Sequence, residues 1–456
     1  MSTSMPWRRI TALLLTIGLG AAACGSDSTE GTDTTGGSSA TTEGAGSDTS
    51  EGGSANGDCS DPVGCVTVAE GDPIQVGTLL VISGSDASLG QDSQNGAVLG
   101  VDYLDGELDG TPGQIAGHDV KWQHEDDGCS ADGGQAGGEA LAANSDIVAV
   151  IGTSCSSAAL GVADKIMSDA GIPLISPSNT GPALTGEDHQ PFYLRTAHND
   201  KIQGAVVAGF VQGEKGLKTA ATINDESPYA DGLAAAFRTA FEKDGGTITS
   251  VEAIKSDDTD FTNLLNSIAQ AKPEVLYFPV FTSACSLIAK QAAEIMPDTL
   301  LISSDGCLSA GTIETAGDAV NGLFASSPDL SVFASGDFYS KEFLPAYQEQ
   351  FGSAPTAVFH AHAFDAVQIL AQAIEKVAVK NSDGGLTIPR DGLREALFAT
   401  KDYKGITGTI TCLPSGDCAT NVTIGVFEGP AWPVEGGSKD AKAVYSDTKS
   451  LADIGG

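Results

Sequence analysis

The chain has 456 residues, of which 41% are hydrophobic, so it is long enough for two or three packed domain equivalents. Its formal net charge of −37 argues against nucleic acid as a partner and against a basic patch that would lie on a membrane surface.

The first residues are typical of an export signal. Arg8 and Arg9 precede an apolar stretch, 10–23, which is too short to span a bilayer. The stretch ends in Ala-Ala-Ala-Cys at 21–24, which is similar to a bacterial lipoprotein signal whose cysteine becomes the lipidated N-terminus, although Ala21 stands where that pattern prefers Leu. We expect a signal peptide over 1–23 and lipidation of Cys24, with a plainly secreted chain as the alternative. Either outcome places the rest of the chain outside the cytoplasm, and lipidation would hold it at the outer face of the cell membrane.

Residues 24–58 are expected to form the anchor cysteine and a disordered tether. The composition of 25–58 is Gly, Ser, Thr, Ala, acidic residues and one Asn, from which no core can form.

Eight cysteines follow the tether, and an even number in an exported chain indicates disulfides. Their spacing suggests four local pairs: Cys59–Cys65, Cys129–Cys155, Cys285–Cys307 and Cys412–Cys418. Zinc is the competing interpretation, but the chain has no C-x-x-C motif and no clustered His partner, so we expect no metal.

From residue 74 onward, predicted strands and helices alternate. The hydrophobic pattern predicts strands over 74–82, 118–126, 147–152 and 172–177, with helices over 94–104, 133–144 and 157–171 between them. A second series has strands over 218–225, 247–254, 274–280 and 299–304, and helices over 201–214, 229–246, 260–272, 284–295, 336–351 and 358–379. Residues 405–429 alternate around a central turn and predict a β-hairpin. The nearly continuous apolar strands favour an α/β fold in which mostly parallel sheets are covered by helices.

Ligands in such folds bind beyond the carboxyl ends of the strands, so the residues that follow each strand are the candidate site. Hydroxyls at helix starts suit a carboxylate, an acidic side chain suits an ammonium group, and apolar side chains suit a hydrophobic substituent. Together these groups predict a site for an amino acid: hydroxyls and N–H groups of the segments 155–157 and 177–180 for the carboxylate, Asp305 for the ammonium, and Leu89, Tyr229 and Phe281 for the side chain. The alternatives are ordinary ones, namely helix N-caps for the hydroxyls, a turn for Asp305 and packing for Tyr229.

Residues 72–430 resemble the periplasmic branched-chain amino-acid-binding proteins, which are type I solute-binding proteins of ABC importers. The resemblance is carried by "VIGTSCSSAALGVADKIMSDAGIPLISPSNTGPALT" and "EDDGCSADGG", with weaker support from "NDESPYADGLA" and "AFDAVQIL". It implies a Cys129–Cys155 disulfide and a carboxylate site at Ser156, Ser178 and Thr180. It also implies the same roles for Asp305, Tyr229, Phe281 and Leu89. Asp305 stands where the best-known members carry Glu, Phe281 where the family often has Tyr, and Leu89 near an aromatic position. These departures leave the preferred ligand side chain open.

The resemblance implies two lobes that close on a ligand by a hinge. We expect the first lobe over 72–197 and 331–405, the second over 198–330 and 406–435, and a tail over 436–456. Hinge crossings are expected near 195–200, 328–334 and 404–408. A Cys285–Cys307 disulfide would tie together two loops that bear site residues.

The expected function is an extracytoplasmic substrate-binding lipoprotein of an ABC importer, a monomer that binds a neutral amino acid or a related carboxylate or amide and delivers it to a permease. A ligand-sensing module for a membrane receptor is the alternative. We expect no enzyme and no cofactor, because the chain lacks G-x-S-x-G, a P-loop and a G-x-G-x-x-G after a strand, and because His360 and His362 would point apart on a helix.

Overall fold

The computed structural model describes residues 59–333, 337–437 and 441–455. The expected signal peptide, the Cys24 anchor and the tether up to residue 58 therefore lie outside the described residues. Within the described ranges, no helix is both long enough and apolar enough to cross a membrane.

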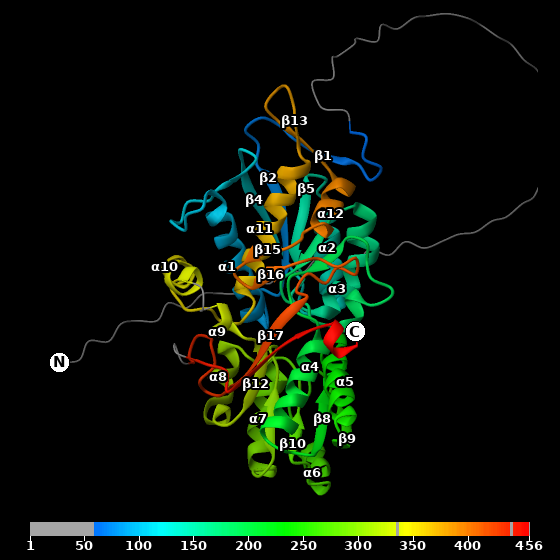
Figure 1. Cartoon of the computed structure of the whole chain (residues 1–456), viewed down its shortest axis with the longest axis vertical. Coiled ribbons are helices and arrows are strands. Elements are labelled where there is room, and N and C mark those ends of the chain that lie inside the picture. Colours follow the sequence, from blue (N-terminus) through cyan, green and yellow to red (C-terminus); the bar gives the residue numbers. More distant parts are fainter. Residues whose placement is uncertain (1–58, 334–336, 438–440, 456) are drawn as a thin grey trace, which may run out of the picture. The chain divides into compact units, whose positions relative to one another are not determined.

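The first lobe is built on a six-stranded sheet with the order β3-β4-β2-β5-β6-β7 (Figure 1). Its strands are β2 (Ile74–Leu80), β3 (Gln114–Ile115), β4 (His118–Asp126), β5 (Ile147–Gly152), β6 (Leu174–Ser176) and β7 (Tyr193–Arg195). All neighbours pair in parallel except β3, which forms an antiparallel edge with β4. Every residue of β5 is buried, because helices cover both faces of the sheet at this central strand.

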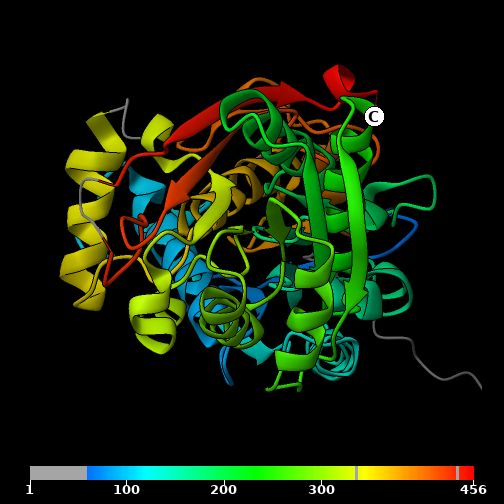
Figure 2. The ribbon, with the colours of Figure 1, turned by 90° about the horizontal axis from the view of Figure 1, so that it is seen from below.

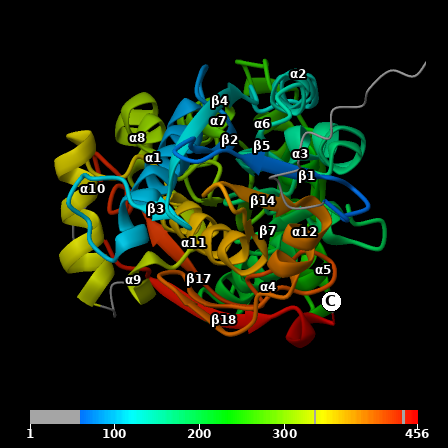
Figure 3. The same cartoon turned by 90° about the horizontal axis from the view of Figure 1, so that it is seen from above.

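The helices of the first lobe lie on both sides of its sheet (Figure 3). One face carries α2 (Ala131–Ala142) and α3 (Ser156–Val162), and the other carries α1 (Ala87–Asp102) and α11 (His360–Val377). The lobe also contains the helices α10 (Leu344–Phe351) and α12 (Arg390–Phe398). A small antiparallel sheet is formed by β1 (Cys65–Val68), β14 (Leu386–Pro389) and β13 (Val379–Lys380). A hairpin is formed by β15 (Tyr403–Gly405) and β16 (Gly408–Ile410).

The second lobe contains a seven-stranded sheet with the order β18-β17-β12-β11-β10-β8-β9. Its strands are β8 (Thr219–Asn224), β9 (Thr247–Ala253), β10 (Val275–Tyr277), β11 (Leu300–Ser303), β12 (Phe324–Pro328), β17 (Asn421–Glu428) and β18 (Tyr445–Ser450). Its helices are α4 (Asp200–Gly209), α5 (Pro228–Lys243), α6 (Thr262–Gln270), α7 (Thr282–Ile295) and α8 (Ala310–Ala316). Figure 2 views this lobe from below, with the green strands β8 and β9 side by side. The predicted fold class, parallel sheets flanked by helices in two lobes, is confirmed.

Two expectations for the C-terminal part are wrong. Residues 405–429 do not form one hairpin, because β16 turns back onto β15 and β17 instead pairs with β12 and β18. The turn that sends β16 back is held by the buried carboxylate of Asp365, which accepts hydrogen bonds from the backbone N–H groups of Ile406 (3.0 Å) and Thr407 (2.9 Å). Residues 436–456 are not a tail either, since β18 forms the edge of the second sheet.

The chain passes between the lobes at three places. The first crossing joins β7 to α4, and the second follows β12, where the short helix α9 (Leu330–Phe333) begins. The third lies between Cys418 and β17 rather than at the expected 404–408. The reason is that residues 416–418 pair with the backbone of Arg195 in the first lobe: Arg195 N–H donates to Gly416 O (2.9 Å) and Cys418 N–H donates to Arg195 O (3.1 Å).

A fully buried arginine holds the first and third crossings together. The Arg195 guanidinium donates from Nε to Asp417 Oδ1 (2.9 Å) and forms an ion pair with the same oxygen through Nη2 (2.8 Å). Its remaining hydrogen bonds go to the carbonyl oxygens of Asn179 (3.1 Å) and Gly181 (2.9 Å) and to Thr185 Oγ1 (2.7 Å). A buried charge is tolerated only when it is paired and hydrogen-bonded in this way.

Replacing Asp417 with Ala should therefore lower the free energy of unfolding by about 3–5 kcal/mol, because it leaves a buried, unpaired guanidinium. Urea denaturation of the purified protein measures this change. The matched control is Lys341→Ala, which removes an exposed ion pair with Asp337 and should change stability by less than about 1 kcal/mol. Equal effects of the two substitutions would contradict the assigned role of the buried pair.

Candidate functional site

The predicted site residues come from loops at the carboxyl ends of parallel strands in both lobes. In the first lobe, Ser156 begins α3 after β5, Ser178 and Thr180 follow β6, and Leu89 lies in the first turn of α1 after β2. In the second lobe, Tyr229 lies in the first turn of α5 after β8, Phe281 follows β10 and Asp305 follows β11.

These loops enclose a small cavity of about 20 Å³ between the lobes, space for about one water molecule. Its lining contains six of the seven predicted residues; Thr180 is not part of it. The lining residues are Leu89, Ser154, Cys155, Ser156, Ser178, Tyr229, Phe281, Asp305, Gly306 and Phe359.

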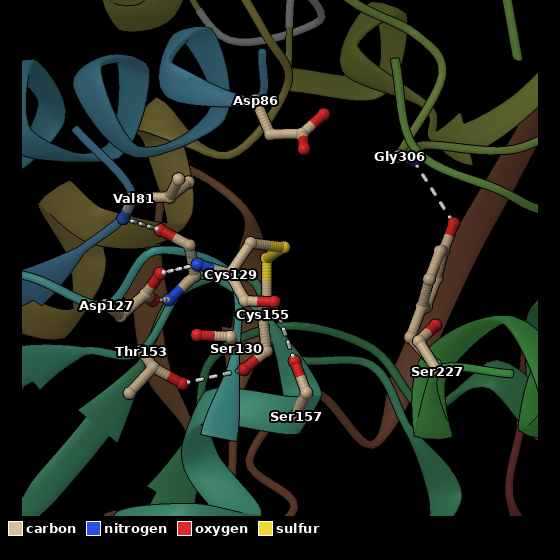
Figure 4. Close-up of a disulfide and its surroundings, with 12 residues drawn as sticks. Val81, Asp86, Asp127, Cys129, Ser130, Thr153, Cys155, Ser157, Ser227 and Gly306 are labelled. Carbon is tan, nitrogen blue, oxygen red and sulfur yellow. Dashed lines mark hydrogen bonds between the residues drawn. A yellow bond between two sulfur atoms is a disulfide. The ribbon is translucent and has the colours of Figure 1, made fainter. Parts of the chain in front are cut away.

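A buried carboxylate and a disulfide fix the loop that presents Ser156 (Figure 4). Asp127 accepts hydrogen bonds from the backbone N–H groups of Ser154 (2.6 Å) and Cys129 (2.8 Å). The Cys129–Cys155 disulfide then joins the loop after β4 to the start of α3. Burial is the largest influence on the Asp127 carboxyl and raises its pKa to about 7, against the opposing effect of these N–H groups. The sequence analysis missed Asp127, although it is the second Asp of the quoted "EDDGC" segment.

Two further features keep the start of α3 open toward the cavity. Cys155 is the N-cap residue of α3 but its side chain accepts no capping hydrogen bond, so the first N–H groups of the helix have no side-chain cap. The strand β5 ends at Gly152, which has φ 149°, and a Cβ at this position would lie 2.2 Å from the carbonyl oxygen of Leu79. Only glycine allows β5 to turn this close to β2.

The loop after β6 brings its hydroxyls against the same turn. Ser178 Oγ donates to the carbonyl oxygen of Ser154 (3.0 Å), and Ser156 Oγ accepts from the backbone N–H of Gly181 (3.2 Å). Both hydroxyls therefore already have a protein partner. Thr180 differs: its Oγ1 is buried without a hydrogen bond of regular geometry among the described residues, and it interacts with the Asp200 carboxyl.

Two buried acids lie close together on the opposite side of the site. Asp305 Oδ1 accepts a hydrogen bond from Gln203 Nε2 (2.7 Å), and burial raises the pKa of the Asp305 carboxyl to about 6. Asp200, in the first turn of α4, is fully buried, and neither of its carboxyl oxygens has a hydrogen-bond partner within the described ranges. Burial, followed by the charge of Asp305, raises the pKa of Asp200 well above its ordinary value, and the Thr180 hydroxyl beside it opposes this rise.

Aromatic and aliphatic groups form the remaining wall. The rings of Tyr229 and Phe281 lie 5.0 Å apart between centroids, and Leu89 belongs to a cluster that packs against Phe281 across the two lobes. The Tyr229 hydroxyl is engaged by Ser304 Oγ (2.6 Å) and accepts from the backbone N–H of Gly306 (3.1 Å). A Cβ at Gly306 would lie 3.1 Å from the Tyr229 ring and 3.2 Å from the Phe281 ring, so glycine preserves the space between them.

The structure joins the same four cysteine pairs that the spacing suggested. Cys285–Cys307 connects the first turn of α7 to the loop after β11, so it ties the segment after Phe281 to the segment that bears Asp305. The described residues contain no group of three His, Cys, Asp or Glu side chains placed to hold a metal ion. His360 instead contacts the buried carboxylate of Asp92 through Nδ1 (3.0 Å).

A larger hollow of about 800 Å³ lies elsewhere, between α4, α5 and the C-terminal residues. Its floor is mostly Ala and Gly, and its charged groups, such as Lys201, Asp231 and Lys243, are exposed. The smaller cavity is the better candidate site, because both lobes enclose it and buried polar groups converge on it.

The predicted ligand-binding set lacked four cavity-lining residues and the acid beside Asp305; of the four, Cys155 was predicted only as a disulfide partner. Ser154 and Gly306 are neighbours of predicted residues, so the strand-end rule could have included them. Phe359 precedes α11, far along the chain, and no strand end marks it. Asp200 follows the N-cap Asn199 in "HNDKIQG", and an acid in the first turn of a helix is ordinary. Its position beside Asp305 is evident only in the folded structure.

Comparisons with known proteins agree on the fold. Residues 73–423 match the profile of a family described as periplasmic binding protein. The chain is 25% identical over 359 residues to the Leu/Ile/Val-binding protein homolog 3 of Brucella melitensis, covering 78% of this chain and 92% of that protein. It is 26% identical over 305 residues to the leucine-, isoleucine-, valine-, threonine- and alanine-binding protein of Pseudomonas aeruginosa, covering 67% and 79%.

Solved structures are similar at lower identity. The leucine binding protein LivK of Thermotoga maritima matches with a TM-score of 0.71 and 22% identity over 83% of this chain and 99% of that one. A solute binding protein of an ABC transporter from R. palustris, solved with benzoate, matches with a TM-score of 0.67 and 22% identity over 82% and 97%. At these identities the two structures show a shared fold.

The raised pKa of Asp305 predicts a stability change that depends on pH. The folded, ligand-free protein binds a proton at Asp305 more tightly than the unfolded chain, so this stabilising contribution is complete below about pH 4 and is lost as pH rises through about 6. Asp305→Asn, which keeps an acceptor for Gln203, should therefore be more stable than the ligand-free wild type by about 1–3 kcal/mol at pH 8 and similar to it at pH 4.

Urea denaturation at the two pH values measures the difference. Asp298→Asn changes an exposed carboxyl and serves as the control, with no change expected at either pH. A wild type that is as stable as the Asn variant at pH 8 would contradict the prediction.

Proposed function

This chain belongs to the periplasmic binding protein family, and we propose that it binds a neutral α-amino acid with an aliphatic side chain in the cavity between its lobes. The family consists of solute-binding proteins, so the chain is a binding protein and not an enzyme. The proposal rests on one observation: Asp305 lines the cavity, and the buried carboxyl of Asp200 lies close enough behind it for the two charges to interact, so a cation at this end of the cavity would relieve their repulsion.

The ammonium end of the ligand is supported by Asp305 and Asp200. A buried carboxylate without a partner is costly, and the cost is relieved when a cation arrives. Asp305 lines the cavity and can accept directly from a ligand ammonium. Asp200 and Thr180 do not line the cavity, and Asp200 acts on this end of the site through its interaction with Asp305.

The carboxylate end is supported by the turn between β5 and α3. The helical segment that begins at Ser156 has no side-chain N-cap, and its first N–H groups carry partial positive charge. Ser156 and Ser178 line the cavity at the same place. We therefore place the ligand carboxylate there, and we see no group arranged to attack it among the described residues.

The ligand side chain would lie against Leu89, Phe281 and Phe359. Asp305 is the one charged residue in the described lining, and we assign it to the ammonium, so the wall offers no partner for a charged side chain. With the lobes as in this structure the cavity measures about 20 Å³, so an amino acid would enter only as the lobes move apart. Relatives named for leucine, isoleucine and valine support this class of ligand.

We further propose that the loaded protein is a monomer that delivers its ligand to the permease of an ABC importer from outside the cytoplasm, held at the membrane by a lipid on Cys24. The sequence of residues 1–24 supports the anchor, and the ABC transporter named for the R. palustris protein supports the pathway.

A thermal-shift panel tests the ligand class. L-leucine, L-isoleucine or L-valine at 100 times its Kd should stabilise the protein by about 2.7 kcal/mol. At the same concentrations, 4-methylpentanoate (no ammonium) and 3-methylbutylamine (no carboxylate) should give little or no shift. A shift with benzoate or acetamide alone would overturn the proposed amino-acid specificity.

Thr180→Val is the sharpest binding variant that the site offers. It keeps the shape of the side chain and removes a hydroxyl without a hydrogen bond of regular geometry among the described residues, so the melting temperature of the ligand-free protein should stay the same or rise. Affinity for the amino acid should fall about 10- to 100-fold, the value of one hydrogen bond to a charged group. Ser156→Ala is less clean, because the Ser156 hydroxyl also accepts from Gly181.

Isothermal titration calorimetry measures this loss of affinity. Ser93→Ala is the matched control, since it removes another buried hydroxyl without a described partner, in α1 and outside the cavity lining. Unchanged affinity in Thr180→Val would remove Thr180 from the proposed site.

A further inference from the structure

A buried histidine in the first hinge crossing contacts the glutamine that holds Asp305. His198 lies between β7 and α4 and is fully buried. Its Nε2 forms a short hydrogen bond with Gln203 Oε1. Because an amide oxygen can only accept, His198 Nε2 carries the proton. Burial lowers the pKa of His198 to about 4, so the ring is neutral and Nδ1, which has no hydrogen-bond partner among the described residues, is the unprotonated nitrogen.

The acceptors at the other end of the Gln203 side chain set which way its amide faces. Nε2 donates to Asp305 Oδ1 (2.7 Å) and also approaches Ser326 Oγ (2.9 Å) and Ser326 O (3.1 Å). The opposite orientation would place the amide oxygen against the Asp305 carboxylate and the Ser326 carbonyl oxygen, where acceptors repel each other. In the orientation so fixed, His198 donates to Oε1 and holds the Gln203 amide in place beside Asp305.

The same histidine also touches the other lobe. Its ring stacks on Phe359 with centroids 6.4 Å apart and planes 14° from parallel. Phe359 lines the cavity from the first lobe, at the start of α11, whereas Gln203 and Asp305 belong to the second lobe. The neighbouring Thr196 Oγ1 donates to the carbonyl oxygen of His362 in α11 (2.9 Å), which fixes the crossing against the first lobe.

We propose that His198 and Gln203 are positioning residues for the ammonium site: they hold the Asp305 carboxylate ready for a cation, and the selectivity of the cavity for amine-bearing ligands depends on them. This inference rests on the proposed function. The residues that hold the Asp305 carboxylate would then lie in a hinge crossing and contact both lobes.

Several other groups face Asp305 or its partners and stay unchanged in the test below. From α4, α5 and β10 these are Asp200, Tyr229 and Tyr277, and near His198 they are Arg195 and His362.

The first measurement needs no ligand. The Asp305 carboxyl is titrated by ¹³C NMR in the free protein labelled at Asp, with Asp305→Asn identifying its signal. Two variants remove the support: Gln203→Met deletes the donor to Asp305, and His198→Phe keeps a ring on Phe359 but removes the hydrogen bond that holds Gln203 Oε1. Each should raise the pKa of Asp305 by about one unit, the equivalent of one hydrogen bond.

Gln212→Met is the matched control, because Gln212 follows α4 and donates to the carbonyl oxygen of Phe241 (3.0 Å), away from the site. An Asp305 pKa that is the same in wild type, Gln203→Met and His198→Phe would overturn the positioning role, whatever the ligand proves to be.

The second measurement compares Kd values for L-leucine and 4-methylpentanoate. Both variants should weaken L-leucine binding about twofold at pH 7, and the loss should grow toward about tenfold near pH 5, because the raised pKa lets Asp305 protonate at a higher pH than in wild type; 4-methylpentanoate binding should stay unchanged. Equal weakening of both ligands would show a merely structural role and would count against the proposal. If wild type binds neither ligand, the proposed leucine-type specificity fails, and the NMR titration still decides the role of His198 and Gln203.

Discussion

The buried guanidinium of Arg195 is the interaction on which the site geometry depends. A charge without access to water must find a partner for each of its donors, and Arg195 finds them on Asp417 and on the loop from Asn179 to Thr185. That requirement ties the third crossing to the first and fixes the loop that carries Thr180. Since the backbone N–H of Asp200 donates to the Thr180 carbonyl oxygen (3.0 Å), the same constraint extends to the start of the second lobe.

The two ends of the cavity differ in whether their polar groups already have hydrogen-bond partners. At the carboxylate end the hydroxyls of Ser156 and Ser178 are already hydrogen-bonded, so the loop keeps its shape without a ligand. At the ammonium end the carboxyls of Asp200 and Asp305 are buried with too few donors, so their pKa values are raised. A cation relieves that electrostatic cost, which makes the ammonium end the part of the site where ligand chemistry is discriminated most strongly.

The local rules of sequence predicted most of the elements and most of the cavity lining. Strand β5 and the residues after β6, β10 and β11 were located because a buried apolar run followed by small polar residues marks a strand end in a parallel sheet. The pairing of β16 and the position of β18 were predicted incorrectly, since alternation shows that a strand exists and does not show which strand it joins. The support of Asp365 for the turn at Ile406 is a contact between distant segments, which no local pattern records.

The sequence by itself determined the α/β class, the four cysteine pairs suggested by spacing, and the residue types that meet at the strand ends. Only the tertiary structure decided that Asp200 lies buried beside Asp305, that Phe359 lines the cavity, and that His198 contacts Gln203. The physical reason is that hydrophobic period and turn chemistry act over a few residues, whereas burial and the partners of a polar group are set by chain segments that meet only after folding.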